Sequence, residues 1–158
     1  METLFFDTIA GIPIHPLVVH AVVVLAPLYA VTLVYFISKN KFSRFQGFLL
    51  FGAAIVAGSA FLANQSGEVL ASRVGLPQSH ALYGKYTTIV SGLVFLILLT
   101  YWVLGSKISR SLQRLARIFL VILSIFSILT VVLAGHSGAQ SVWEKRIAGT
   151  HVGDHPTE

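Results

Sequence analysis

Four long stretches of the chain consist of uncharged, mostly apolar residues. They cover residues 8–38, 45–67, 86–106 and 118–143. A bilayer core about 30 Å thick is crossed by roughly 20 apolar residues in an α-helix. Lipid offers no partner to unpaired backbone N–H and C=O groups, so each crossing segment has to be helical. The pattern therefore predicts four membrane-spanning helices, at about 17–38, 45–63, 80–105 and 115–135.

The links between these spans predict an all-α bundle with up-down-up-down topology. The turn at 39–44 is short, so the first two spans should form an antiparallel hairpin. A longer loop is expected at 64–76. Pro16 suits the first turn of a helix, and it disfavours helical geometry for the residue before it, His15. We therefore expect the first span to begin just after this proline, and the first and third spans to be diagonal neighbours.

The composition agrees with a membrane domain and excludes several kinds of site. Of the 158 residues, 55% are hydrophobic and 11% are charged, whereas soluble domains average about 25% charged residues. Residues 1–150 are expected to form one four-span domain, and residues 151–158 a disordered tail. The chain has no cysteine, which excludes disulfides, iron–sulfur clusters, thiolate metal sites and covalently attached haem.

Charge is unequally distributed between the two ends of the predicted bundle. The net charge is +5, and most of the basic residues lie in the two links that join the first span to the second and the third to the fourth. These residues are Lys39, Lys41, Arg44, Lys107, Arg110, Arg114 and Arg117. Because positive loops stay in the cytoplasm, we expect an inner (plasma) membrane protein with both termini outside, on the periplasmic side. The pattern favours a lipid bilayer as the partner and not nucleic acid.

Three histidines stand near the outer ends of apolar runs on three different spans. His20 follows Pro16 closely, His80 follows Pro77 closely, and His136 lies just beyond the apolar part of the last span. At a rise of about 1.5 Å per residue, all three side chains can reach one layer near the outer interface. Ionisable groups in a membrane bundle cost free energy and indicate a functional site. Simple hydration at a helix end is the alternative interpretation.

Haem is the first cofactor that such a layer suggests. A b-type haem needs two neutral imidazoles on opposite sides of the porphyrin, which facing helices of a bundle supply. We expect His20 and His80 as the axial pair, and next a pair that includes His136. Arg73 and Lys85 are expected to meet the propionates. The glycines expected to make room for a flat cofactor are Gly58, Gly84 and Gly135.

A single metal ion is the alternative. Three imidazoles, from His20, His80 and His136, suit Cu, Zn or Fe. His15 lies on the same outer side, and Glu68 is the only acid in the predicted 64–76 loop, so both are further candidate ligands.

The two halves of the chain also resemble each other. Ala63-Asn64-Gln65-Ser66-Gly67, at the end of the second span, matches Ala134-Gly135-His136-Ser137-Gly138, at the end of the fourth. His20-Ala21 matches His80-Ala81. A repeat of this kind has a pseudo-twofold axis along the membrane normal. It predicts that His20 corresponds to His80.

Several motifs resemble those of a bacterial four-helix membrane family, DUF2231, whose function is unknown. They are the opening His15-Pro16-Leu17-Val18-Val19-His20, the central His80-Ala81-x-x-Gly84, and the closing Gly135-His136-Ser137-Gly138 followed by Val142-Trp143. The resemblance covers about residues 13–150. The chain departs from the family pattern at Ala139, where a second glycine is usual, and at Ala21, where a phenylalanine is frequent. Relatives occur beside or fused to Rieske-type or cytochrome domains, so the resemblance implies a redox partner.

These observations lead to one hypothesis and two alternatives. The first is a membrane-embedded b-type haem protein that transfers electrons near the outer surface, to or from quinol or a redox partner protein. The second is a non-haem protein that binds Cu, Zn or Fe. The third is a cofactor-free accessory subunit of a membrane complex. An electron carrier or subunit is favoured over a stand-alone enzyme, and a homo-oligomer is left open.

Overall fold

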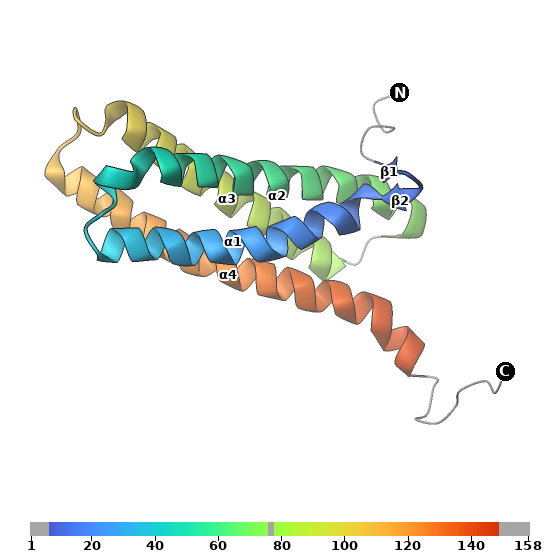
Figure 1. The fold of residues 1–158 in the computed structure, drawn as a ribbon. Helices are drawn as coiled ribbons and strands as arrows, with labels where there is room; N and C mark the ends of the chain where they lie inside the picture. Colours follow the sequence, from blue (N-terminus) through green and yellow to red (C-terminus); the bar gives the residue numbers. More distant parts are fainter. Residues whose placement is uncertain (1–6, 76–77, 149–158) are drawn as a thin grey trace.

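The computed structural model describes residues 7–75 and 78–148, and four long helices dominate it (Figure 1). The elements are β1 (Thr8–Ile9), β2 (Ile12–Pro13), α1 (Ile14–Ser38), the short 3-10 helix η2 (Ser43–Phe45), α2 (Gln46–Val74), α3 (Gln78–Leu104) and α4 (Arg110–Ile147). All four α-helices are long and apolar enough to cross a membrane. The predicted all-α four-helix bundle is confirmed.

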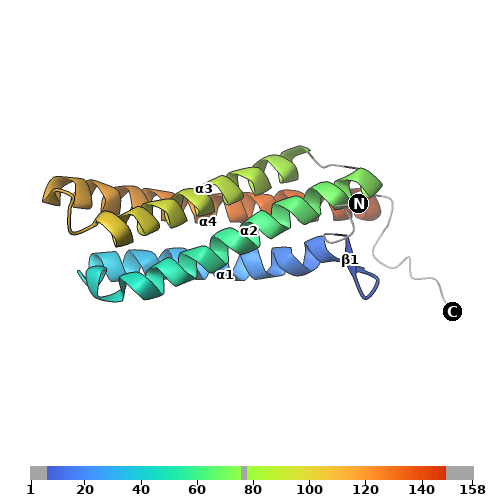
Figure 2. The same ribbon diagram turned by 90° about the horizontal axis from the view of Figure 1, so that it is seen from above.

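The helices alternate in direction, and each packs against two neighbours. α1 and α3 both contact α2 and α4, so α1 and α3 are diagonal across the bundle, as expected (Figure 2). α1 begins and α4 ends at the same end of the bundle (Figure 1). We call this end, where α1 and α3 begin, the histidine end. The opposite end, formed by residues 39–45 and 105–117, is the basic end.

The outer surface of the bundle is suited to lipid. Large apolar side chains are exposed along all four helices. Exposed aromatic residues capable of hydrogen bonding lie near both ends: Tyr35 and Trp102 near the basic end, and Tyr86 and Trp143 near the histidine end. Such belts are typical of the two membrane–water interfaces. The protein is therefore a multi-pass membrane protein.

The helices extend beyond the predicted spans. α1 begins at Ile14, so Pro16 lies within its first turn, where a missing N–H costs nothing. The predicted loop at 64–76 is wrong, because α2 continues to Val74 and ends only at Gly75, whose φ is 88°. An uncharged run marks the part of a helix that can lie in lipid, and polar helix formers carry the helix further. The predicted tail, 151–158, lies outside the described residues.

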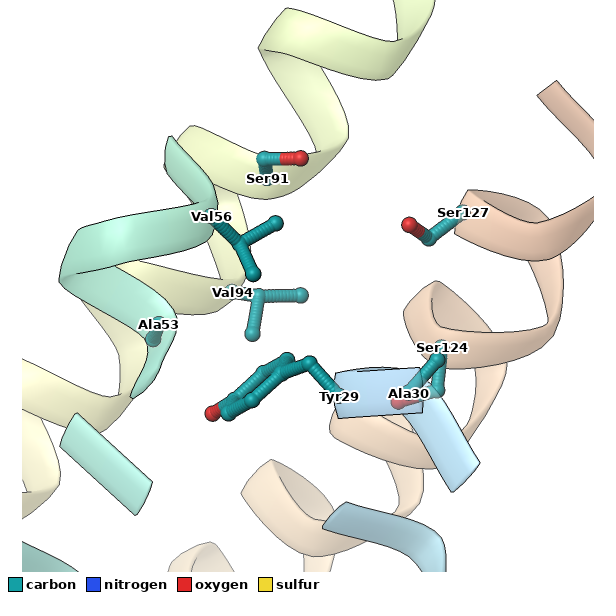
Figure 3. Close-up of a pocket in the computed structure, with 8 residues that line it drawn as sticks. All are labelled: Tyr29, Ala30, Ala53, Val56, Ser91, Val94, Ser124 and Ser127. Atoms are coloured by element: carbon teal, nitrogen blue, oxygen red, sulfur yellow. The ribbon is translucent and has the colours of Figure 1, made fainter. Parts of the chain in front are cut away.

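The interior of the bundle is divided into two apolar clusters. One, around Leu33, Leu49 and Leu120, lies toward the basic end, and the other, around Ala26 and Ala60, lies toward the histidine end. Between them is a cavity of about 10 Å³ whose lining includes three serines and Tyr29 (Figure 3). The serines are Ser91, Ser124 and Ser127. Ser91 is 4% exposed, and its hydroxyl has no hydrogen-bond partner within the described residues.

A two-stranded hairpin precedes α1 at the histidine end. β1 and β2 pair antiparallel, and the turn between them, Ala10-Gly11, has positive φ at both residues, 50° and 81°. This is the geometry of a tight two-residue hairpin turn. Asp7 forms an ion pair with Arg73, which joins the start of the hairpin to the last turn of α2.

Candidate functional site

His15, the second residue of α1, is held against α2. Its Nδ1–H donates to the carbonyl oxygen of Ala63 over 2.9 Å. A carbonyl oxygen can only accept, so Nδ1 carries the proton and Nε2 keeps its lone pair. The ring lies against Gly67, where a Cβ atom would stand 3.0 Å from His15 Cε1. Only glycine at this position allows the imidazole to approach α2 so closely.

His80, near the start of α3, makes the same contacts with α4. Its Nδ1–H donates to the carbonyl oxygen of Ala134 over 2.8 Å. A Cβ atom at Gly138 would stand 2.9 Å from His80 Nδ1. This imidazole is therefore also fixed as the Nδ1–H tautomer, and its Nε2 has no hydrogen-bond partner among the described residues.

The two contact surfaces come from the repeated Ala-x-x-Ser-Gly segments. Ser66 Oγ lies 2.8 Å from Leu62 O and 3.2 Å from Ala63 O, and Ser137 Oγ lies 2.7 Å from Leu133 O and 3.1 Å from Ala134 O. In each half the carbonyl that accepts from the histidine therefore also lies within reach of a serine hydroxyl. The matched segments 63–67 and 134–138 have equivalent roles. The histidine that corresponds to His80, however, is His15 and not His20.

The two imidazoles meet across the bundle. Their ring centres are 5.9 Å apart and their planes are inclined at 83°. The rings belong to the diagonal helices α1 and α3, and each rests on one of the flanking helices α2 and α4. We call His15 and His80 the histidine pair.

The predicted layer of His20, His80 and His136 is not formed. His20 and His136 are exposed, and His20 Nδ1 donates to Pro16 O of its own helix. His20 comes five residues after His15, so the two side chains point about 140° apart around α1. When His15 faces the bundle axis, His20 therefore faces outward, on the same side as the exposed Val24.

The other predicted site residues lie apart from the pair. Glu68 is exposed and accepts a hydrogen bond from Asn64 at 3.1 Å, Arg73 is paired with Asp7, and Lys85 is exposed. Within residues 7–75 and 78–148, no group of three His, Cys, Asp or Glu is placed to hold a metal ion.

The glycines beside the rings are also different from those expected. A Cβ atom at Gly58, Gly84 or Gly135 would meet nothing within 4 Å. Sequence reasoning found the Ala-x-x-Ser-Gly repeat but did not assign Gly67 and Gly138 as contact positions for the rings. The signal was present, because only these two glycines occupy the same place in both copies of the repeat.

The distance between the two ring centres can be compared with the distances expected for two imidazoles on one metal ion. With about 2.0 Å from metal to nitrogen and ~1.2 Å from nitrogen to ring centre, two trans imidazoles have centres about 6.4 Å apart, and two at a tetrahedral ion about 5.2 Å. The observed 5.9 Å falls between these values. Metal-binding histidines usually donate their other N–H to a carbonyl or carboxylate, which raises their basicity. Both rings of the pair do so.

The chain belongs to DUF2231, a family described as predicted membrane protein, whose model matches residues 11–151. The comparisons with curated proteins and with solved structures found no match.

Proposed function

We propose that this DUF2231 protein binds a b-type haem between His15 and His80 and transfers electrons at the histidine end of the bundle. One observation carries the proposal. Two imidazoles from diagonal helices, each with Nδ1–H bonded to a backbone carbonyl, stand 5.9 Å apart with Nε2 available. When bound, the haem supplies a reversible one-electron couple. The protein supplies the two axial nitrogens and fixes their orientation.

The number of imidazoles favours haem over a bare ion. A structural zinc site takes four protein ligands and a catalytic one takes three. A porphyrin already supplies four nitrogens, so that an iron held in it needs only two axial ligands. The histidine pair offers two. The second candidate, a Cu, Zn or Fe ion, would need a further ligand from water or from a partner chain.

α2 and α4 place only small side chains beside the pair, and the imidazoles rest directly on these helices at Gly67 and Gly138. At this level α2 and α4 contribute Ala63, Ser66, Gly67, Ala134, Ser137 and Gly138. The glycines have no side chain, the alanines have a single methyl group, and the serines add one hydroxyl. Lys85, five residues after His80, points about 140° away from it around α3 and is exposed, so it does not face the pair.

The site fits a role at the outer face of the plasma membrane. The positive-inside rule favours the cytoplasm for the basic end, which leaves the histidine end outside. An electron donor or acceptor would then be quinol within the bilayer or a redox partner protein outside it.

An absorption spectrum with elemental analysis tests the proposal. Protein purified in detergent from haem-replete cells should show a Soret band that shifts on reduction, with about one iron per chain. In His80→Asn the side-chain amide can still donate to Ala134 O, but Nε2 is lost. We expect this variant to fold and to lose the band. His136→Asn, which removes an exposed histidine from α4, is the control and should keep it.

The other outcomes decide between the alternatives. Stoichiometric metal without a Soret band would select the bare-ion site and overturn the haem. A colourless, metal-free protein would leave the histidine pair as two hydrogen bonds that join α1 to α2 and α3 to α4. That result would favour the cofactor-free subunit of a larger complex.

A further inference from the structure

A groove opens at the basic end, between the end of α1 and the first turns of α4. Its volume is about 340 Å³. The polar side chains that line it are Arg114, Arg117 and Asn40, and its apolar wall includes Ile118, Val121 and Ile122. It is at the opposite end of the bundle from the histidine pair, so its function is independent of the proposed haem.

The groove is polar at one end and apolar along the rest of its length. Its α4 residues, 114, 117, 118, 121 and 122, recur at helical spacing and so lie on one face. From Arg114 to Ile122 this face extends about 12 Å along the axis, at 1.5 Å per residue. The guanidinium groups come first and the branched apolar side chains follow. A phospholipid has the same order, with a phosphate followed by an acyl chain.

The two arginines have complementary roles. Arg117 is held in place, because its Nη2 donates to Tyr101 Oη over 2.9 Å and its guanidinium lies over the ring of Phe42 at 5.4 Å. Arg114 is exposed and has no hydrogen-bond or ion-pair partner within the described residues. One guanidinium is thus pre-positioned at the edge of the groove and the other is free to close on a ligand.

The aromatic belt at this end indicates that the arginines lie at the depth expected for lipid headgroups. Arg117 contacts Tyr101, and the next residue, Trp102, is 53% exposed and belongs to the aromatic belt of this end. The first acyl carbons of a lipid at this level would lie beside Ile118 and Val121.

The electrostatic surroundings favour an anion. The links and helix ends of the basic end, residues 39–45 and 105–117, contain no Asp or Glu. The C-terminus of α1 and the N-terminus of α4 are both at this end, and their opposite partial charges largely cancel. The full charges of the arginines therefore determine the local potential. A phosphate accepts well from two guanidinium groups.

We propose that this groove binds an anionic phospholipid. The phosphate sits between Arg114 and Arg117, and one acyl chain lies along Ile118, Val121 and Ile122. The lipid would fill the space between α1 and α4 where their ends separate, and it would anchor the basic end to an anionic leaflet.

Native mass spectrometry of the full chain in mild detergent tests this proposal. The probes are phosphatidylglycerol and phosphatidylcholine with the same oleoyl chains. We expect phosphatidylglycerol to bind more tightly, and Arg114→Gln to weaken its binding about fivefold, the effect of one basic residue at an anionic surface. The matched control is Arg110→Gln, which removes the same charge one turn earlier in α4 and should weaken binding less than Arg114→Gln, because Arg114 lines the groove and Arg110 does not.

Two further arms separate a lipid from a free anion. Phosphatidylglycerol with six-carbon chains should bind much more weakly than the oleoyl lipid, because it leaves the apolar wall uncovered. Millimolar inorganic phosphate should not displace the oleoyl lipid. Equal binding of the two headgroups, equal losses in Arg110→Gln and Arg114→Gln, or displacement by phosphate alone would each overturn the proposal.

Discussion

Replacing Gly138 by alanine tests how closely the His80 ring rests on α4. The added Cβ atom would lie 2.9 Å from His80 Nδ1 and 3.1 Å from Cε1. An ordinary carbon–nitrogen contact is about 3.5 Å or longer, so the ring has to move by roughly half an ångström or more. The hydrogen bond from Nδ1–H to Ala134 O, now 2.8 Å, cannot survive such a displacement with good geometry.

The expected cost follows from this hydrogen bond and from helix propensity. A buried donor left without its partner costs about 1–3 kcal/mol, and the partly buried Nδ1–H of His80 should fall toward the lower end of this range. Alanine in place of glycine inside a helix raises the free energy of unfolding by about 1 kcal/mol. Gly138→Ala should therefore change the free energy of unfolding by between about 0 and −2 kcal/mol. Gly135→Ala, one turn earlier in α4 with open space at its Cβ, receives only the favourable propensity contribution.

The measurement is the free energy of unfolding of both variants in mixed detergent micelles. Both variants gain the same contribution from helix propensity, so the difference between their free energies of unfolding gives the cost of displacing the ring. We expect Gly138→Ala to be about 1–3 kcal/mol less stable than Gly135→Ala. Gly67→Ala against Gly58→Ala repeats the test on α2. Equal stability within each pair would refute the proposed contact between ring and helix.

Three other substitutions test the packing of the bundle. Ser91→Ala removes a buried hydroxyl with no partner within the described residues, so the free energy of unfolding should stay constant or rise by up to ~1 kcal/mol; a clear loss would indicate a partner such as bound water. Thr88→Val removes a hydroxyl that lies 3.1 Å from both Ala60 O of α2 and Gly84 O of its own helix, and should cost about 0.6–1.7 kcal/mol in the same assay if it donates to Ala60 O; no loss would contradict an interhelical bond. Asp7→Asn breaks the ion pair with the exposed Arg73 and should lower stability by less than about 1 kcal/mol, an effect that high salt removes; a larger, salt-independent loss would be inconsistent with a solvated pair.

The sequence was sufficient to predict the bundle. Long uncharged runs have to be helical in lipid, which predicts four spans. Short links make consecutive spans antiparallel neighbours, which predicts that the first and third spans are diagonal. The Ala-x-x-Ser-Gly repeat was also visible in the sequence. Its two copies make equivalent contacts, with Ala63 and Ala134 as acceptors.

The identity of the first histidine in the pair could not be predicted in the same way. A soluble helix has one apolar face that indicates its inward side, but α1 is apolar all round. The rotation of the helix about its axis was therefore undetermined, and His15 and His20 were equally placed. A proline is tolerated anywhere in the first turn of a helix, so Pro16 does not mark the first helical residue. Because α1 begins at Ile14, His15 lies on the helix and faces inward.

The central claim is that His15, and not His20, shares a ligand with His80. The most direct measurement is the Soret absorbance per chain of His15→Asn and of His20→Asn, purified in parallel from haem-replete cells. We expect the His15 variant to lose the band, because it keeps the hydrogen bond to Ala63 O but lacks Nε2, and the His20 variant to match the unmodified protein. Loss of the band in His20→Asn together with its retention in His15→Asn would contradict the claim.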